Sequence, residues 1–149
     1  MSIKLNGGLA ALALALAIAA PAAAQYVPRN YDKGPVTLVQ EYRIAPGKFN
    51  AFMQDFAANQ RRGLEIGKKN DGILDYGVAQ LITRREGDPN VVTLITFKNL
   101  AAYDRSFQRG DETAVAVYGS LEKANDAAAA RGAYTTLLNS RLYQGLQIK

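Results

Sequence analysis

The stretch of sequence that joins the first expected strand to the first expected helix is VTLVQEYRIAPGKFNAFMQDF, residues 36–56. Its first ten residues are rich in β-branched and aromatic side chains and predict a strand over 36–45. Pro46 and Gly47 end that strand. Apolar residues then recur at steps of three and four, which predicts a helix over 48–69. Three phenylalanines fall on one stripe of this helix, so the stripe must dock on a flat apolar surface such as a sheet.

The rest of the chain predicts three more strands and a second helical region. The second and third strands are separated by the five-residue loop 86–90, which favours an antiparallel hairpin. The segment 134–138 is ambiguous. The remaining predicted elements are strands over 73–85 and 91–97, a helix capped by Asn99, a helix over 111–130 and a strand over 140–148.

This β-α-β-β-α-β order predicts an α+β, ferredoxin-like fold, in which a four-stranded antiparallel sheet carries helices on one face. The other face of such a sheet is open. Every predicted strand has apolar residues on both sides. A soluble monomer rarely exposes an apolar sheet face of several hundred Å² to water. We therefore expect a homodimer in which two sheets pack against each other.

The first 24 residues predict a secretory signal peptide. Lys4 supplies a positive charge, an uncharged run of Ala, Leu and Ile covers 9–20, and small residues at 22–24 precede Gln25. A bilayer-spanning helix needs about 20 strongly apolar residues, and this run is shorter and rich in Ala. We therefore expect cleavage before Gln25, a periplasmic or secreted bacterial protein, and no stable membrane insertion afterwards.

The exported chain is expected to have one domain. Residues 25–35 contain two prolines and a glycine and are interpreted as a flexible N-terminal arm. Residues 36–149 form the predicted ferredoxin-like domain.

The composition excludes several classes of chemistry. The chain of 149 residues contains no Cys, His or Trp. Disulfides, thiolate nucleophiles, Ser-His-Asp triads, zinc fingers and His-ligated haem are therefore excluded, and neither a metal nor a cofactor is expected. The net charge is +5. The doubled basic pairs at 61–62, 68–69 and 84–85 have acids interleaved, so they are interpreted as a solvated face and no nucleic acid is expected as a partner.

The segment Tyr42-Arg43-Ile44-Ala45-Pro46-Gly47-Lys48-Phe49 resembles the junction of strand, "PGK" turn and Phe-bearing helix found in the dimeric α+β barrel superfamily. This superfamily includes the antibiotic biosynthesis monooxygenases, NIPSNAP-like proteins and stress-responsive A/B barrel proteins. The resemblance covers residues 36–148 and implies a dimeric barrel. Its haem-degrading branch uses an Asn, a Trp and a His, and this chain lacks the last two. The resemblance carries no catalytic residue over to this chain, so the catalytic residues are unknown.

Polar residues among apolar strand positions are the candidate ligand-binding residues. Within each strand they occupy alternate positions, so their side chains point to the same side. If that side faced the interior of a barrel, they would offer amide and phenol groups to a ligand. The alternative is that they bond to one another at sheet edges or in the dimer interface. The candidates are Gln40, Tyr42, Tyr76, Gln80 and Gln144. The residues that point to the other side of the strands include charged ones. Glu41 with Arg43, or Asp75 with Arg141, are interpreted as salt bridges at strand ends, and the alternative is an acid–base set in a cavity.

Two functions remain open from the sequence. The first is binding, or cofactor-free oxidation, of a small organic ligand, in which the protein supplies a base and a dry pocket. The second is a non-catalytic structural or protein-interaction module in the periplasm. The sequence does not determine whether the protein is an enzyme.

Overall fold

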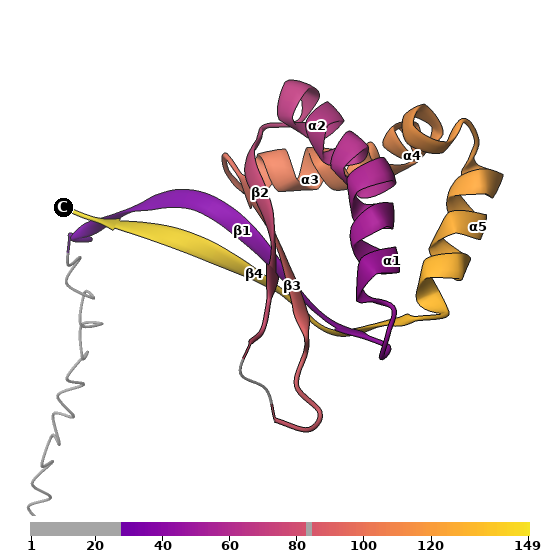
Figure 1. Cartoon of the computed structure of the whole chain (residues 1–149). Coiled ribbons are helices and arrows are strands. Elements are labelled where there is room, and N and C mark those ends of the chain that lie inside the picture. Colours follow the sequence, from indigo (N-terminus) through magenta and orange to yellow (C-terminus); the bar gives the residue numbers. More distant parts are fainter. Residues whose placement is uncertain (1–27, 83–84) are drawn as a thin grey trace, which may run out of the picture.

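The fold is seen in a computed structural model that describes residues 28–82 and 85–149 (Figure 1). Four strands form one antiparallel sheet in the order β2-β3-β1-β4, and the helices gather on one side of it. The predicted ferredoxin-like α+β fold is confirmed. The predicted signal peptide and the first three residues of the predicted arm lie outside the described residues. No helix in the described part of the chain is long and apolar enough to span a membrane.

The elements follow the predicted order. The helix predicted over 48–69 is found as three successive pieces, the middle one a π-helical turn. In chain order the elements are β1 (Tyr31–Ile44), α1 (Phe49–Asp55), η1 (Phe56–Gln60), α2 (Arg61–Asn70), β2 (Ile73–Gln80), β3 (Val91–Phe97), α3 (Leu100–Gln108), α4 (Gly110–Tyr118), α5 (Leu121–Gly132) and β4 (Thr135–Ile148).

Strand β1 begins five residues earlier than predicted, at Tyr31, which pairs with Ile148 of β4. Residues 31–35 of the predicted arm are therefore part of the sheet. From the sequence, the prolines and the glycine of the arm are expected to prevent a strand. Gly34 and Pro35 instead lie where the pairing of β1 with β4 is bulged, between Lys33 and Val36. A bulge tolerates a proline because the missing N–H falls where the ladder is already interrupted.

The second helical region is more broken than predicted. Asn99 caps α3 as expected, since its side chain accepts a bond from the Ala102 amide at 2.9 Å. The helix predicted over 111–130, however, is two helices. Gly119 ends α4 with a φ of +87°, and the Ser120 side chain then caps α5 by accepting from the Lys123 amide at 3.2 Å. Only glycine adopts such a φ without strain, so this residue sets the corner.

The apolar core lies between the sheet and the helices, in two clusters. Phe52 packs with Ile44 and Val91 at one end of β1. Ala102 packs with Ile73 and Phe97 toward the other end. The side of β1 that carries the candidate residues Gln40 and Tyr42 therefore faces the helices.

The opposite face of the sheet is only partly covered. In the described part of the chain no helix lies on it, and a Cβ added at Gly77 would meet nothing within 4 Å. Leu94 lies at its centre, between Gly77 and Val39 in the strand register, and is 36% exposed. Glu41 and Arg141 form an ion pair of 3.9 Å on this face. The face is thus mixed apolar and charged.

Replacing Phe52 by alanine tests the packing of α1 on the sheet. The side chain is 3% exposed, so Phe52→Ala is expected to lower the free energy of unfolding by about 3–5 kcal/mol through lost burial and a residual cavity. Urea unfolding measures this. Phe107→Ala is the matched control, because that ring is 80% exposed and its loss should change the same quantity by less than about 0.5 kcal/mol. Equal effects of the two substitutions would contradict the assigned core.

Candidate functional site

Three adjoining hollows lie between the sheet and the helical layer. We call them the inner cavity (about 50 Å³), the middle pocket (about 290 Å³) and the outer cleft (about 790 Å³). Ile95 lines all three, and Gln40 lines both the inner cavity and the outer cleft. The three hollows therefore adjoin one another over the middle of β1 and β3.

A row of polar side chains crosses the sheet beneath these hollows. Gln40 on β1 lies opposite Thr93 on β3 and Ser140 on β4. The neighbouring positions on the same face are apolar or aromatic: Leu38 faces Ile95, and Tyr42 faces Val91. The polar row thus separates the two clusters of the core, and the inner cavity lies over it.

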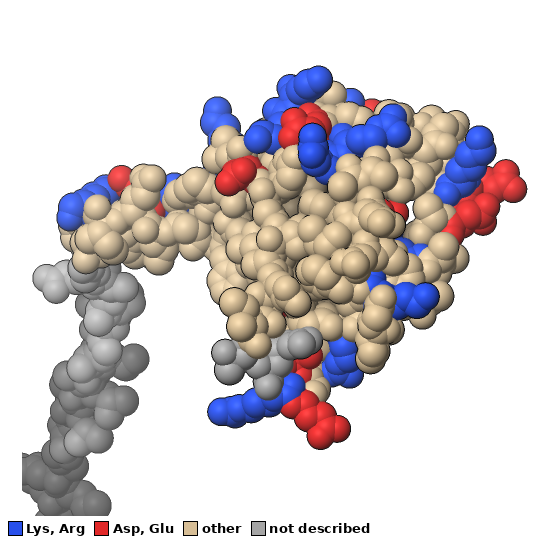
Figure 2. Space-filling model, in the orientation of Figure 1, with Lys and Arg blue, Asp and Glu red and all other residues tan. Residues whose placement is uncertain are grey.

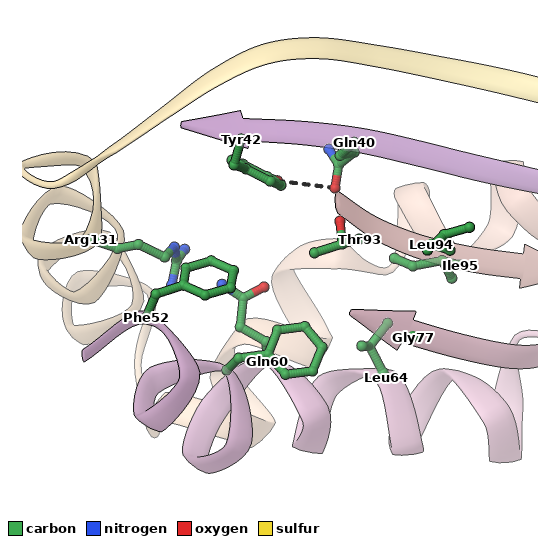
Figure 3. A pocket seen from close by; sticks show the side chains of 11 residues that line it. Gln40, Tyr42, Phe52, Gln60, Leu64, Gly77, Thr93, Leu94, Ile95 and Arg131 are labelled. Atoms are coloured by element: carbon green, nitrogen blue, oxygen red, sulfur yellow. Dashed lines mark hydrogen bonds between the residues drawn. The ribbon is translucent and has the colours of Figure 1, made fainter. Parts of the chain in front are cut away.

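Tyr42 supplies a phenol hydroxyl to the inner cavity. Its hydroxyl donates to Gln40 Oε1 at 3.1 Å (Figure 3). Burial raises the pKa of Tyr42 above its ordinary value of 10.0, although the Arg131 charge and a hydrogen bond with Thr93 oppose the rise. The phenol is therefore neutral at physiological pH and acts as a hydrogen-bonding group, not as a base.

Arg131 enters the inner cavity from α5, on the side opposite the polar row (Figure 3). Its Nη1 donates to Asp55 Oδ2 at 2.9 Å, and the two side chains are 23% and 18% exposed. With the Gln60 amide turned so that its oxygen faces the guanidinium, that oxygen accepts from Arg131 Nη1 and Nε at 3.0 and 3.1 Å. This orientation leaves the Gln60 NH₂ as a donor for other groups.

The charge of Arg131 is compensated inside the protein. Burial lowers the pKa of Arg131, but hydrogen bonds and charge interactions with Asp55 and Tyr118 outweigh it, so the pKa lies above its ordinary value. Asp55 is held from a second side, because Asn59 Nδ2 donates to its Oδ1 at 2.9 Å. The pair therefore offers a ligand a fixed, neutralised polar wall instead of a free cation.

The π-helical turn η1 shapes the floor of the inner cavity. Phe56 and Gln60, at its two ends, both line the cavity together with Phe52 of α1. A π turn widens the helix by one residue and is often found at functional sites. Here it brings one aromatic ring and one amide to the same space.

The structure brings together two of the five candidate residues. Gln40 and Tyr42 line the inner cavity. Tyr76 is on strand β2 and donates to Glu65 at 2.6 Å, with the Lys68 ammonium 5.5 Å from its ring centre. Gln80 lines a separate pocket near the Pro46-Gly47 turn, and Gln144 donates to the Gly34 carbonyl at 2.6 Å. These three therefore lie away from the cavity.

Three polar residues of the cavity were not among the candidates. Thr93 is the one polar residue among the positions of β3 that point to the helices, since the others are Val91, Ile95 and Phe97. This contrast was the available signal. Gln60 interrupts the apolar stripe of the first helix, which is a similar signal. Arg131 carried no such signal, since near a helix C-terminus it is a common residue.

The fold agrees with known structures. No protein-family model and no curated protein matches the chain. HapK from Hahella chejuensis is similar in structure, with a TM-score of 0.52 and 10% identity over 74% of this chain and 91% of that one. A dimeric ferredoxin-like protein from an uncultured marine organism has a TM-score of 0.50 and 10% identity over 79% and 98% of the two chains. The chain has the ferredoxin-like α+β fold of these proteins. At these identities the likeness shows the fold alone.

A double-mutant cycle tests whether the Asp55–Arg131 pair ties α5 to α1. Because both groups are largely buried, the coupling free energy from Asp55→Ala, Arg131→Ala and the double variant is expected to be about 1–2 kcal/mol in urea unfolding. The control cycle uses Asp32 and Lys149, which are 65% and 55% exposed at 3.0 Å and should couple by less than about 1 kcal/mol. Coupling no larger than in the control would show that the pair has no structural role.

Proposed function

We propose that the protein is an exported, homodimeric binding protein for a small organic molecule, which it holds in the hollow between the sheet and the helices. One observation carries this proposal: a polar row within an otherwise apolar sheet face lies under a cavity instead of under a helix. Binding sites typically combine an apolar lining with a few convergent polar groups.

The lining indicates the kind of molecule. The outer cleft is walled by Leu38, Phe97, Tyr103 and Phe107, and its volume of about 790 Å³ suits an organic molecule of several rings. The inner cavity, at about 50 Å³, has room only for a small substituent. We therefore propose an elongated, largely aromatic ligand that lies in the cleft and directs one polar group toward Gln40.

Binding is favoured over base-catalysed oxidation by the groups around the inner cavity. Among the described residues that line it, none is a carboxylate. The Tyr42 phenol has a raised pKa, and the nearby Asp55 is occupied by Arg131 and Asn59. The polar group that a ligand directs into the inner cavity therefore meets hydrogen-bonding groups there and no carboxylate base, whereas the carboxylate of Asp111 lines the outer cleft.

Export rests on the N-terminal sequence. The charged start, the apolar run 9–20 and the small residues before Gln25 support a cleaved leader. Mass spectrometry of the N-terminus tests it.

The homodimer rests on the uncovered sheet face. Val39, Val92 and Leu94 share that face with the Glu41–Arg141 ion pair, so it is apolar at its centre and polar nearby. A core of this kind within a polar rim is typical of protein interfaces. One of the similar structures is itself described as a dimeric ferredoxin-like protein.

The ligand proposal predicts a stabilising shift with multi-ring aromatic compounds. A panel of naphthols, quinones and flavonols is screened by thermal unfolding and native mass spectrometry. At least one compound should bind the wild type with one molecule per subunit. Ser106→Trp should abolish binding, because Ser106 lines both the middle pocket and the outer cleft. Gln40→Leu should weaken it about tenfold through loss of one hydrogen bond.

Ala116→Trp is the matched control, since Ala116 is exposed on α4 and lines none of the three hollows. It should leave the affinity unchanged. No binding by the wild type to any compound would favour the interaction-module function. Unimpaired binding by Ser106→Trp would place the ligand elsewhere.

The dimer proposal predicts a mass of two subunits by light scattering at micromolar concentration. Leu94→Lys should halve the mass, because it puts a charge at the centre of the interface, where the cost of desolvation is high. Leu121→Lys, on α5 and 44% exposed, should leave the dimer intact. A wild-type protein of single-subunit mass would overturn the proposed interface.

A further inference from the structure

Figure 2 shows basic side chains gathered over the end of the molecule at which α2 lies in Figure 1, with a few acidic side chains among them. We call this surface the basic end. Four of its residues lie on α2, and two come from the segment that leads into and through α3. They are Arg61, Arg62, Lys68, Lys69, Lys98 and Arg105.

The chain brings the two groups together at the turn after α2. The Lys98 amide donates to the Gly72 carbonyl at 2.9 Å. A Cβ added at Gly72 would lie 3.8 Å from Lys98 Cβ and 4.0 Å from Arg105 Nη2. Lys98 and Arg105 are more than 25 positions after the α2 cations in sequence, so the basic end is a product of the fold and not of the doubled pairs alone.

None of the six cations forms an ion pair with a described residue, whereas Arg109, Arg131, Arg141 and Lys149 each do. Glu65 lies between the cations of α2 and accepts a hydrogen bond from Tyr76, and Asp104 directly precedes Arg105. The buried Asp71 at the end of α2 is neutralised by Arg109 at 2.9 Å. Arg62 donates to the Val117 carbonyl at 3.2 Å, and the Lys68 ammonium lies 5.5 Å from the centre of the Tyr76 ring, but neither contact removes a positive charge.

The basic end carries a local excess of positive charge. The chain has 18 basic and 13 acidic residues, and six of the 18 lie here. The acids close to them in sequence are Glu65, Asp75 and Asp104, while Asp71 is paired with Arg109. Six cations less three acids leave +3, and such an excess favours approach to an anionic surface.

Two exposed leucines are close in sequence to the Gly72 turn and to Lys98, which the fold joins. Leu74 is 48% exposed and follows the Gly72 turn by two residues. Leu100 is 51% exposed and follows Lys98 by two residues. Because Lys98 bonds to Gly72, both leucines lie close to the same turn. Apolar side chains among cations are typical of surfaces that adsorb to bilayers, where the cations meet headgroup phosphates and the apolar groups enter the acyl boundary.

We propose that the basic end adsorbs reversibly to the surface of an anionic lipid bilayer, without crossing it. The cations bind headgroup phosphates, and Leu74 and Leu100 enter the interface between headgroups and chains. The leucines are the reason for choosing a bilayer over a soluble polyanion, since phosphates or sulfates in solution would gain nothing from them. This surface lies outside the ligand hollow, so the proposal stands independently of the proposed function.

Co-sedimentation with vesicles tests the proposal. The protein is used as recovered after expression, with its N-terminus established by mass spectrometry and shared by all variants. It should bind vesicles that contain phosphatidylglycerol, should not bind pure phosphatidylcholine, and should be released by added salt. Lys69→Glu with Lys98→Glu should weaken binding by at least 25-fold, since each lost cation is expected to cost about fivefold, or about 1 kcal/mol.

Two further variants make the result specific. Lys48→Glu with Lys123→Glu changes the net charge equally at exposed residues outside the basic end, and it should bind as the wild type does within about twofold. Leu74→Ser with Leu100→Ser should weaken vesicle binding but leave binding to soluble heparin unchanged. Thermal unfolding confirms that each variant is folded.

Three outcomes would overturn the proposal. The first is failure of the wild type to sediment with anionic vesicles at low salt. The second is an equal loss of binding in both charge-reversal doubles, which would show that net charge alone acts. The third is wild-type vesicle binding by the leucine double while heparin competes, which would identify a soluble polyanion as the partner.

Discussion

The polar row formed by Ser140, Gln40 and Thr93 is the constraint on which the arrangement of this protein depends. Amide and hydroxyl groups that face a helical layer must find partners, because an unpaired buried polar group costs more than the apolar contact it replaces. Gln40 is satisfied locally by the Tyr42 hydroxyl, and no buried side-chain polar atom among the described residues lacks a partner. A large apolar side chain placed over this row would remove such partners. The core therefore divides into two clusters, and space remains between them.

The space between the sheet and the helices persists because ion pairs attach α5 and the junction of α3 and α4 to the rest of the protein. Helix α5 has no buried residue, yet Arg131 fixes it to Asp55 at the end of α1. The junction of α3 and α4 is fixed in the same way, by Arg109 on the buried Asp71. Apolar packing alone would draw these helices onto the sheet until the gap closed, whereas a hydrogen-bonded ion pair sets a distance. The hollow is thus a consequence of how the layer is attached.

The sequence predicted the elements whose signals are local. Strand β3 was predicted at its observed bounds, and the Asn99 cap was correct, because alternation and capping depend on near neighbours. The start of β1 at Tyr31 was missed because its pairing with Ile148 spans the whole domain. Gly119 was missed because a helical pattern continues across it, although the following Ser120 is a usual cap.

The sequence likewise predicted only part of the candidate site. The alternation of residues along β1 predicted that Gln40 and Tyr42 point to the same side of the strand. It does not predict which side the helices cover. Because the helices cover the face that carries Gln40 and Tyr42, the hollow lies between the sheet and the helices of the same chain. Arg131 reaches the cavity from a helix 76 positions after its partner Asp55, and no local pattern reports such a contact.

Helix α3 shows how this small domain keeps two surfaces apart. Tyr103, Ser106 and Phe107 line the outer cleft, while Arg105, between them in sequence, reaches the turn at Gly72. Successive helical residues are about 100° apart around the axis, so one face of the helix walls the cleft and another belongs to the basic end. A change of charge at Arg105 therefore leaves the cleft wall intact. A ring added at Ser106 leaves the basic end intact, and the two surfaces are separable by substitution.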